Sequence, residues 1–176
     1  MRKSEFDSEM THAPRERKTK SAQQALQALM RLCSRAEKST GDAMRLMRTW
    51  GVPEAERQGV VDTLIAHRFI SNRRYAEAYA REKSSLSGWG PKKIAMQLRA
   101  KGVEREIITE IISQYDGNTH RERLAERLRR KLRTTKASSE YELRGKLLRY
   151  ALSLGYDYDT AMACLEQLHI EQRENL

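Results

Sequence analysis

Basic side chains are the most prominent chemical feature of this 176-residue sequence, and they fall in two stretches. Residues 73–101 contain eight basic and two acidic residues, and residues 121–150 contain eleven basic and four acidic residues. The segments 102–120 and 151–176 carry a net negative charge. With a formal net charge of +10 for the whole chain, this distribution favours an acidic partner. It leaves nucleic acid, an anionic membrane and an acidic protein surface open.

The spacing of these cations predicts stripes on helices. Lys92 and Arg99 are seven residues apart, which places them on one side of a helix, opposite Ile94 and Leu98. A second stripe, also opposite apolar positions, comprises Arg123, Arg127, Arg130 and Lys131. A charged stripe is often only the solvated face of a helix, but these two occupy equivalent positions of the repeat described below. Such stripes can bind a track of phosphates or acidic side chains without disturbing a core.

The segment Gly88-Trp89-Gly90-Pro91-Lys92-Lys93 has features of an anion-binding loop. Its glycines permit close approach of a partner, and the helix that Pro91 opens has free N–H groups at its start. The pattern of a Walker A loop is absent, and the resemblance to a helix–hairpin–helix DNA motif is superficial. The Trp89 side chain could stack on a base, insert into a protein pocket or pack between two repeats.

Residue types that support catalysis or metal binding are scattered along the chain. The four histidines have no H-x-x-x-H spacing and no neighbouring cysteine pair, and the sequence contains neither G-x-S-x-G nor a dinucleotide-binding fingerprint. Cys33 and Cys164 both fall in apolar helical patterns, which favours buried, reduced thiols over a disulfide or a metal site. We therefore expect no enzymatic activity, no cofactor and no metal.

The elements that carry the cations are predicted to be helices throughout, because apolar residues recur at spacings of three and four and do not alternate for long enough to form a strand. In residues 71–116, Ser71 and Asn72 are N-cap types, residues 84–90 form a breaker-rich loop, and Pro91 opens a second helix. Gly102 ends that helix, and a third follows with an isoleucine-rich face and its glutamates turned to water. This stretch is therefore predicted to be three helices around one core.

Three glycines indicate an internal repeat. Gly51, Gly102 and Gly155 are separated by 51 and 53 residues, and each follows one helical pattern and precedes another. Chance similarity between helical hairpins is the alternative. We predict an all-α, elongated array of three tandem three-helix repeats, comprising residues 21–70, 71–116 and 117–176, after a disordered tail of residues 1–20.

Capping and breaking residues predict the other helix boundaries. The first helix should run from Ser21 to near Lys38, with a break at residues 40–42, before a second helix that stops at Gly51 and a third that starts at Pro53. Residues 119–122 and 139–142 both fit the S/T-x-x-E capping box. The sequence lacks a signal-peptide pattern and any apolar run of about 18 residues, so we expect a cytoplasmic protein that does not enter the membrane.

Residues 68–108 resemble the central signature of the RecX family, which regulates the bacterial recombinase RecA. The resemblance is carried by the Arg-Tyr-Ala of residues 74–76, the Gly-Pro before Lys-Lys-Ile in residues 90–94, and the Leu-x-x-Lys-Gly-Val of residues 98–103. It is looser over residues 21–70 and 117–176. One difference is the Phe-Ile-Ser-Asn of residues 69–72, where the family usually has an acidic pair.

The resemblance implies three tandem three-helix repeats and a non-enzymatic modulator that lies along the groove of a RecA–DNA filament and usually inhibits it. The implied partners are the RecA filament and the phosphates of single- or double-stranded DNA, for a protein that acts as a monomer. The binding candidates are Arg73, Arg74, Arg81, Lys83, Trp89, Lys92, Lys93, Arg99 and Lys101, followed by Arg123, Arg127, Arg130 and Lys131. Two alternatives are a helical-repeat DNA-binding protein that acts independently of RecA and a scaffold that binds only protein.

Overall fold

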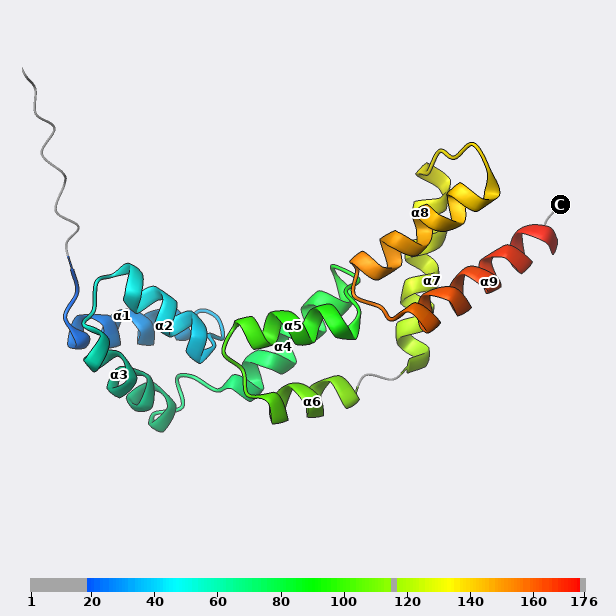
Figure 1. The fold of residues 1–176 in the computed structure, drawn as a ribbon. Helices are drawn as coiled ribbons and strands as arrows, with labels where there is room; N and C mark the ends of the chain where they lie inside the picture. The colour runs from blue at the N-terminus through cyan, green and yellow to red at the C-terminus, as the bar shows by residue number, and fades with distance from the viewer. Residues whose placement is uncertain (1–18, 115–116, 175–176) are drawn as a thin grey trace, which may run out of the picture.

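The computed structural model describes residues 19–114 and 117–174, and its regular structure is helical, which confirms the predicted all-α fold. The helices form three consecutive groups. They are α1 (Ala22–Cys33), α2 (Thr40–Thr49) and α3 (Glu54–Ala66) in repeat 1; α4 (Asn72–Ser85), α5 (Pro91–Ala100) and α6 (Arg105–Ser113) in repeat 2; and α7 (Gly117–Thr134), α8 (Glu140–Ser153) and α9 (Tyr158–Glu174) in repeat 3. Figure 1 shows the repeats following one another along an elongated, curved molecule.

Each repeat encloses an aliphatic core of its own. Leu29, Met47 and Leu64 are buried in repeat 1, Ile94 and Leu98 in repeat 2, and equivalent leucines in repeat 3. The predicted disordered tail lies almost wholly outside the described residues, of which Thr19 and Lys20 are the first. In the described part of the chain, none of the helices combines the length and apolar character needed to cross a membrane.

Serine hydroxyls begin several of the helices. The Ser71 hydroxyl accepts the N–H of Arg74 at the start of α4, and Ser139 caps α8 in the same way, as predicted. The break predicted at residues 40–42 is wrong, because the Ser39 hydroxyl accepts the Asp42 N–H at 3.0 Å and starts α2 there. The helix predicted to reach Lys38 accordingly ends at Cys33.

Repeat 3 begins earlier than the capping pattern predicts. Residues 119–122 fit a capping box, but α7 starts at Gly117, so that segment lies inside the helix. Of the two hydrogen bonds of a capping box, residues 139–142 form only the first, in which the Ser139 hydroxyl accepts the Glu142 N–H. The Glu142 carboxylate accepts hydrogen bonds from the backbone N–H and the hydroxyl of Ser138, and not from the Ser139 N–H.

The three glycines of the repeat register occupy equivalent backbone positions. Gly51, Gly102 and Gly155 have φ angles of 69°, 74° and 90°, and each follows the end of the second helix of its repeat. A left-handed residue at this position ends a helix and turns the chain, and glycine adopts it without steric cost. The register inferred from the sequence therefore has a physical basis that is common to all three repeats.

Neighbouring repeats are joined where their second helices meet end to end. At joint 1, between repeats 1 and 2, the Gly41 N–H at the start of α2 donates to the Lys101 carbonyl after α5, at 3.1 Å. At joint 2, between repeats 2 and 3, the Gly90 N–H donates to the Leu154 carbonyl at 2.8 Å, and the Lys92 N–H donates to the Gly155 carbonyl at 3.1 Å. These bonds satisfy donors and acceptors that helix ends leave unpaired, and they align the helix dipoles.

Glycine is required at both joints because the two backbones approach so closely. A Cβ atom on Gly41 would lie 2.4 Å from the Lys101 carbonyl oxygen, and one on Gly90 would lie 2.6 Å from the Gly155 carbonyl. The helices α2, α5 and α8 consequently follow one another along one side of the molecule (Figure 1). We call these three stacked helices the second-helix row.

The outer end of α2 is closed by the same type of bond. The Lys20 N–H donates to the Trp50 carbonyl at 2.9 Å, and Trp50 precedes Gly51 just as Lys101 precedes Gly102. The Lys20 ammonium group also lies over the Trp50 ring, 3.7 Å from its centroid. Lys20 therefore donates to the carbonyl at the end of α2 in the way that a neighbouring repeat donates to the end of α5 at joint 1 and of α8 at joint 2.

Candidate nucleic-acid interface

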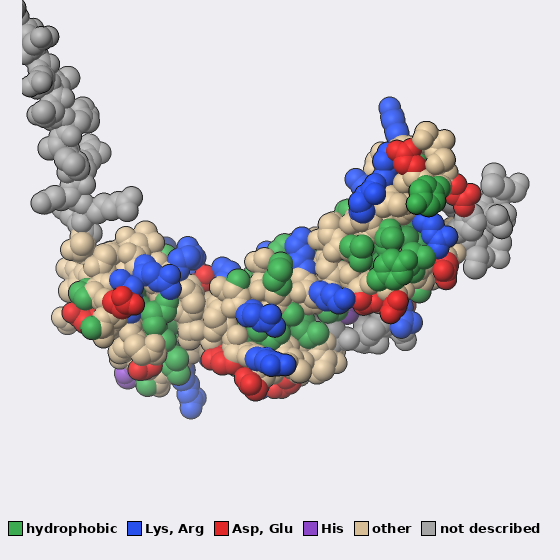
Figure 2. All heavy atoms as spheres, in the orientation of Figure 1, with side chains coloured by type: hydrophobic (Ala, Val, Ile, Leu, Met, Phe, Trp, Pro, Cys, Tyr) green, Lys and Arg blue, Asp and Glu red, His purple; other side chains and the backbone are tan. Residues whose placement is uncertain are grey.

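Exposed cations are found along the outward face of the second-helix row. The position three residues before each register glycine is Arg48, Arg99 or Leu152, and the position six residues before it is Arg45, Met96 or Arg149. All of these side chains are exposed. Figure 2 shows blue patches over the α2, α5 and α8 parts of this face. The end-to-end stacking thus turns three short basic faces into one discontinuous track.

The central part of the track consists of Lys92 and Arg99 on α5. Both are exposed, while Ile94 and Leu98 on the opposite side of the helix are fully buried, as predicted. Within the residues that the structure describes, neither cation has a side-chain hydrogen bond or ion pair. Their separation along the helix axis is about 10 Å, a length that carries about three phosphates on one DNA strand.

Sequence reasoning missed Arg45 and Arg48 of repeat 1. Arg48 is exposed and, among the described residues, has no hydrogen-bonded side-chain partner, whereas Arg45 reaches Asp42 at 3.2 Å. The signal that identifies them was available in the glycine register, which places Arg48 at the position of Arg99.

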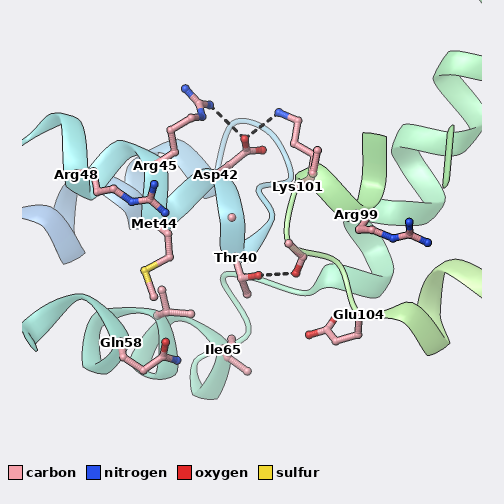
Figure 3. A pocket seen from close by; sticks show the side chains of 14 residues that line it. Thr40, Asp42, Met44, Arg45, Arg48, Gln58, Ile65, Arg99, Lys101 and Glu104 are labelled. Atoms are coloured by element: carbon pink, nitrogen blue, oxygen red, sulfur yellow. Dashed lines mark hydrogen bonds and ion pairs between the residues drawn. The ribbon is translucent and has the colours of Figure 1, made fainter. Parts of the chain in front are cut away.

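A hollow of about 650 Å³ lies at joint 1, beside these arginines. Figure 3 shows Arg45 and Lys101 pointing toward Asp42 from either side, with Arg48 on the α2 side of the hollow. The Lys101 ammonium contacts the Asp42 carboxylate at 2.9 Å. Burial raises the pKa of Asp42, but the hydrogen bonds from Lys101 and Arg45 outweigh it and hold the pKa below its usual value. Lys101 is therefore committed to the joint.

A further predicted binding residue, Arg74, also holds joint 1 together. The Arg74 guanidinium, at the start of α4, reaches the Glu37 carboxylate at 2.9 Å and the Arg68 carbonyl at 3.0 Å. Next to it, the buried Asn72 amide accepts the Thr40 N–H at 3.0 Å, and its Nδ2 contacts acceptors on Thr40, Gly102 and Glu104. Glu104 is exposed, as predicted, and its carboxylate also contacts the Asn72 amide at the joint.

A further group of the predicted cations forms hydrogen bonds across joint 2. The Arg123 guanidinium donates to the Ser84 hydroxyl at 2.5 Å, and Arg127 donates to the Leu86 carbonyl at 2.8 Å. The Lys93 ammonium donates to the Ser153 carbonyl at 3.0 Å. These residues link α4 and α5 of repeat 2 to α7 and α8 of repeat 3, so their charges are directed at least partly inward.

Trp89 lies in the same joint. Its ring packs against the cores of both repeat 2 and repeat 3, which corresponds to the third of the roles considered for it. The Lys93 and Lys83 ammonium groups lie 4.8 Å and 5.6 Å from the ring centroid, and Tyr79 meets the ring edge-on. Lys83 also contacts the Glu82 carboxylate at 2.8 Å.

The remaining candidates are dispersed over other surfaces. Arg73 pairs with Glu110 of α6 at 2.5 Å, and this glutamate is exposed, as predicted. Arg130 forms an ion pair with Glu126 within α7, and Lys131 lies over the Tyr150 ring at 5.4 Å. Arg81 is exposed on α4 and, in the described part of the chain, has no side-chain partner. Of the residues selected from sequence, the structure therefore brings Lys92 and Arg99 onto the track. Arg99 has no acidic partner among the described residues, and the charge of Lys92 helps to lower the pKa of Asp157.

Comparison with known proteins gives consistent matches. The family model for the second three-helix domain of RecX matches residues 71–112. The regulatory protein RecX of Clostridium botulinum (strain Alaska E43 / Type E3) is 32% identical over 128 residues, which cover 71% of this chain and 58% of the relative. That of Bacillus velezensis (strain DSM 23117 / BGSC 10A6 / LMG 26770 / FZB42) is 26% identical over 137 residues, covering 78% and 51%. The chain spans about half the length of the curated relatives it matches.

Solved structures share the fold. The crystal structure of RecX from Lactobacillus salivarius matches with a TM-score of 0.69 and 22% identity, over 85% of this chain and 97% of that chain. A second crystal structure, of a regulatory protein RecX, matches with a TM-score of 0.75 and 17% identity, over 82% and 71%. At these identities the likeness establishes the arrangement of helices.

Proposed function

Because the chain belongs to the RecX family of regulatory proteins, we propose that it binds the DNA filament formed by the recombinase RecA and inhibits strand exchange, ATP hydrolysis and co-protease activity. In this proposal the protein acts in the cytoplasm, as a monomer, and its effect on DNA repair comes from binding alone. No chemical step is assigned to its own residues.

The second-helix row is the main structural support for the proposal. Arg48, Lys92 and Arg99 are exposed on helices that the joints hold end to end, and Arg48 and Arg99 have no acidic partner among the described residues. A polyanion that winds past the row can release counterions at each such cation without any change in the protein core. We therefore assign the DNA-facing role to Arg48, Lys92 and Arg99, and a structural role to the cations of the joints.

The chemistry at the start of α5 favours phosphate over base edges. Lys92 is a compact point charge, whereas reading of bases in the major groove relies on bidentate Arg, Asn or Gln side chains near the start of a recognition helix. This argues against the alternative of a sequence-specific DNA-binding protein that acts without RecA. A scaffold that binds only protein is disfavoured by the free cations of the row.

The test is inhibition of DNA-dependent ATP hydrolysis by RecA, measured with increasing amounts of the protein. Substoichiometric wild-type protein should slow hydrolysis, and the triple variant Arg48→Glu/Lys92→Glu/Arg99→Glu should lose that effect. The matched control Arg31→Glu/Arg105→Glu/Arg133→Glu changes the net charge equally, on exposed positions of α1, α6 and α7, and should remain inhibitory. Both variants should melt like the wild type, because none of these side chains contributes to a core.

The outcomes separate the alternatives. No effect of equimolar wild-type protein on RecA would overturn the proposal, and DNA binding that persists in that case would favour the RecA-independent alternative. Equal loss of inhibition in the two triple variants would show that net charge matters and the row does not.

A further inference from the structure

A hydrophobic groove lies between α8 and α9 in repeat 3, apart from the basic positions of α2 and α5. It encloses about 450 Å³, and its apolar lining comes from Tyr141, Leu148, Tyr158 and Met162. The two tyrosines are unusually exposed for aromatic residues, at 90% and 56%. Figure 2 shows a broad hydrophobic patch on repeat 3. Contiguous exposed apolar surface of this kind marks interaction sites on soluble proteins.

Gly145 lines the groove from the middle of α8. A Cβ atom at this position would meet only the Arg149 Nη1 atom, at 3.9 Å, so no close packing excludes a side chain here. The missing side chain leaves the groove open along the surface of α8.

The second-helix row also changes its chemistry at repeat 3. The position of Arg48 and Arg99 is taken by Leu152, which is 41% exposed, and the position of Lys92 is taken by Gly145. Repeat 3 thus has an exposed leucine where repeats 1 and 2 have an exposed arginine, and Arg149 remains as a cation three residues earlier. A phosphate track would gain nothing from this change, whereas a protein surface with an apolar side chain would.

The charges that remain around the groove are positive. Arg144 and Arg149 line it. The exposed Arg144 guanidinium forms an ion pair with the Glu166 carboxylate at 3.7 Å. The Glu142 carboxylate, which also lines the groove, is held by the Lys146 ammonium at 2.6 Å and by Ser138. These hydrogen bonds lower the pKa of Glu142 to about 2, so its charge is compensated within the helix. Arg149 has no ion pair among the described residues, so a carboxylate approaching the groove meets one guanidinium group whose charge is unopposed.

We propose that the α8–α9 groove binds a protein segment that presents an apolar side chain next to a carboxylate, with Tyr141 and Tyr158 flanking the apolar group and Arg149 pairing with the carboxylate. The inference rests on the proposed function, in which that segment belongs to a recombinase subunit of the filament. Repeat 3 then contacts protein while α2 and α5 contact DNA.

The experiment fills the groove without touching the core. In the 176-residue protein, Gly145→Leu places a side chain in the groove, and Gly59→Leu is the matched control, because Gly59 lies inside α3 with nothing within 4 Å of its added Cβ. Binding is measured to RecA filaments assembled on single-stranded DNA with a non-hydrolysable ATP analogue, and separately to the same DNA alone. Leucine favours helix, so both variants should melt no lower than the wild type.

We expect Gly145→Leu to weaken filament binding by at least about tenfold while its affinity for DNA alone stays within about twofold, and Gly59→Leu to change neither. Tyr141→Ala, at a side chain that is almost wholly exposed, should weaken filament binding in the same direction. Unchanged filament binding by Gly145→Leu overturns the inference alone. An equal loss on DNA alone also overturns it and assigns the groove to bases stacked on tyrosine. Failure of the wild type to bind filaments overturns the proposed function and the inference with it.

Discussion

Replacing Asn72 by alanine should uncouple repeat 1 from the rest of the array. The Asn72 side chain is only 7% exposed and lies between the two repeats. Its Oδ1 accepts the Thr40 N–H, one of the donors that the start of α2 leaves unpaired, and its Nδ2 lies within 3.1 Å of acceptors on Thr40, Gly102 and Glu104. Alanine removes both functions and adds no steric conflict.

The expected loss follows from the hydrogen-bonding capacity of the amide. One accepted and two donated bonds can exist at once, because Nδ2 carries two protons. Two of these bonds, both to Thr40, connect the repeats, so at about 1 kcal/mol for each bond Asn72→Ala should weaken the joint by about 2 kcal/mol. In an array in which each repeat contacts only its neighbours, this loss falls on the interface and leaves the cores of the separate repeats intact.

The two tryptophans allow the effect to be localised. Trp50 packs in repeat 1, and Trp89 packs between repeats 2 and 3. Urea unfolding is therefore followed by fluorescence in Trp50→Phe and Trp89→Phe backgrounds. The transition reported by Trp50 should move to lower urea in Asn72→Ala, and that reported by Trp89 should move much less. In a double-mutant cycle, Asn72→Ala and Thr40→Ala should be coupled by about 1 kcal/mol.

Two results would refute this reasoning. If both tryptophans reported the same shift, the array would unfold as a single unit and the joint would not be the weak link. If the Trp50 transition moved by less than about 1 kcal/mol, the amide would be contributing no more than a surface hydrogen bond.

Three further predictions concern the row, joint 2 and pH. Lys92→Gln/Arg99→Gln should lower the slope of log affinity against log salt for single-stranded DNA by about 1.4, since each phosphate contact contributes about 0.7. Gly90→Ala places a Cβ 2.6 Å from the backbone of repeat 3 and should destabilise the protein in urea by about 2 kcal/mol through two lost hydrogen bonds, whereas Gly59→Ala should stabilise it by about 1 kcal/mol. The lowered pKa of Asp42 means that its carboxylate stabilises joint 1 above the unfolded-state pKa of about 3.9, and that this stabilisation is lost as the pH falls through the lower folded-state pKa. Asp42→Asn should accordingly be less stable at neutral pH and lose less stability on acidification, and an unchanged acid transition would contradict the assignment.

The fold could be predicted from sequence because its determinants are local. A glycine in a left-handed conformation ends each second helix, and the apolar residues before it point inward at helical spacing. The errors occurred where one residue type has two roles. Thr40 and Gly41 were interpreted as a break because neither favours helix, yet they start α2, where the joint requires a small residue and a free N–H.

The candidate site could be predicted only in part, because the state of a cation depends on residues far away along the chain. Sequence spacing correctly placed Lys92 and Arg99 on the exposed side of α5. It could not show that Arg74 meets Glu37, or that Lys93 reaches the Ser153 carbonyl, since these partners are 37 and 60 residues distant. Local periodicity distinguishes an inward from an outward face, but it carries no information about which outward residues a neighbouring repeat will cover.

Some cations of this chain form hydrogen bonds or ion pairs at the joints, and others are exposed without a partner among the described residues. Substitutions of the two kinds should therefore separate the effect of rigidity from the effect of binding. A row of cations can match a spiral of phosphates only if its helices keep a fixed angle, and this angle is set by Lys101 and Arg74 at joint 1 and by Arg123 and Arg127 at joint 2. Neutralising an engaged cation should therefore lower stability first and binding as a consequence. Neutralising a free cation should lower binding alone. If substitutions of both kinds produced the same ratio of lost binding to lost stability, the positive charge of this chain would act as a diffuse field, and the stacking of α2, α5 and α8 would have no bearing on recognition.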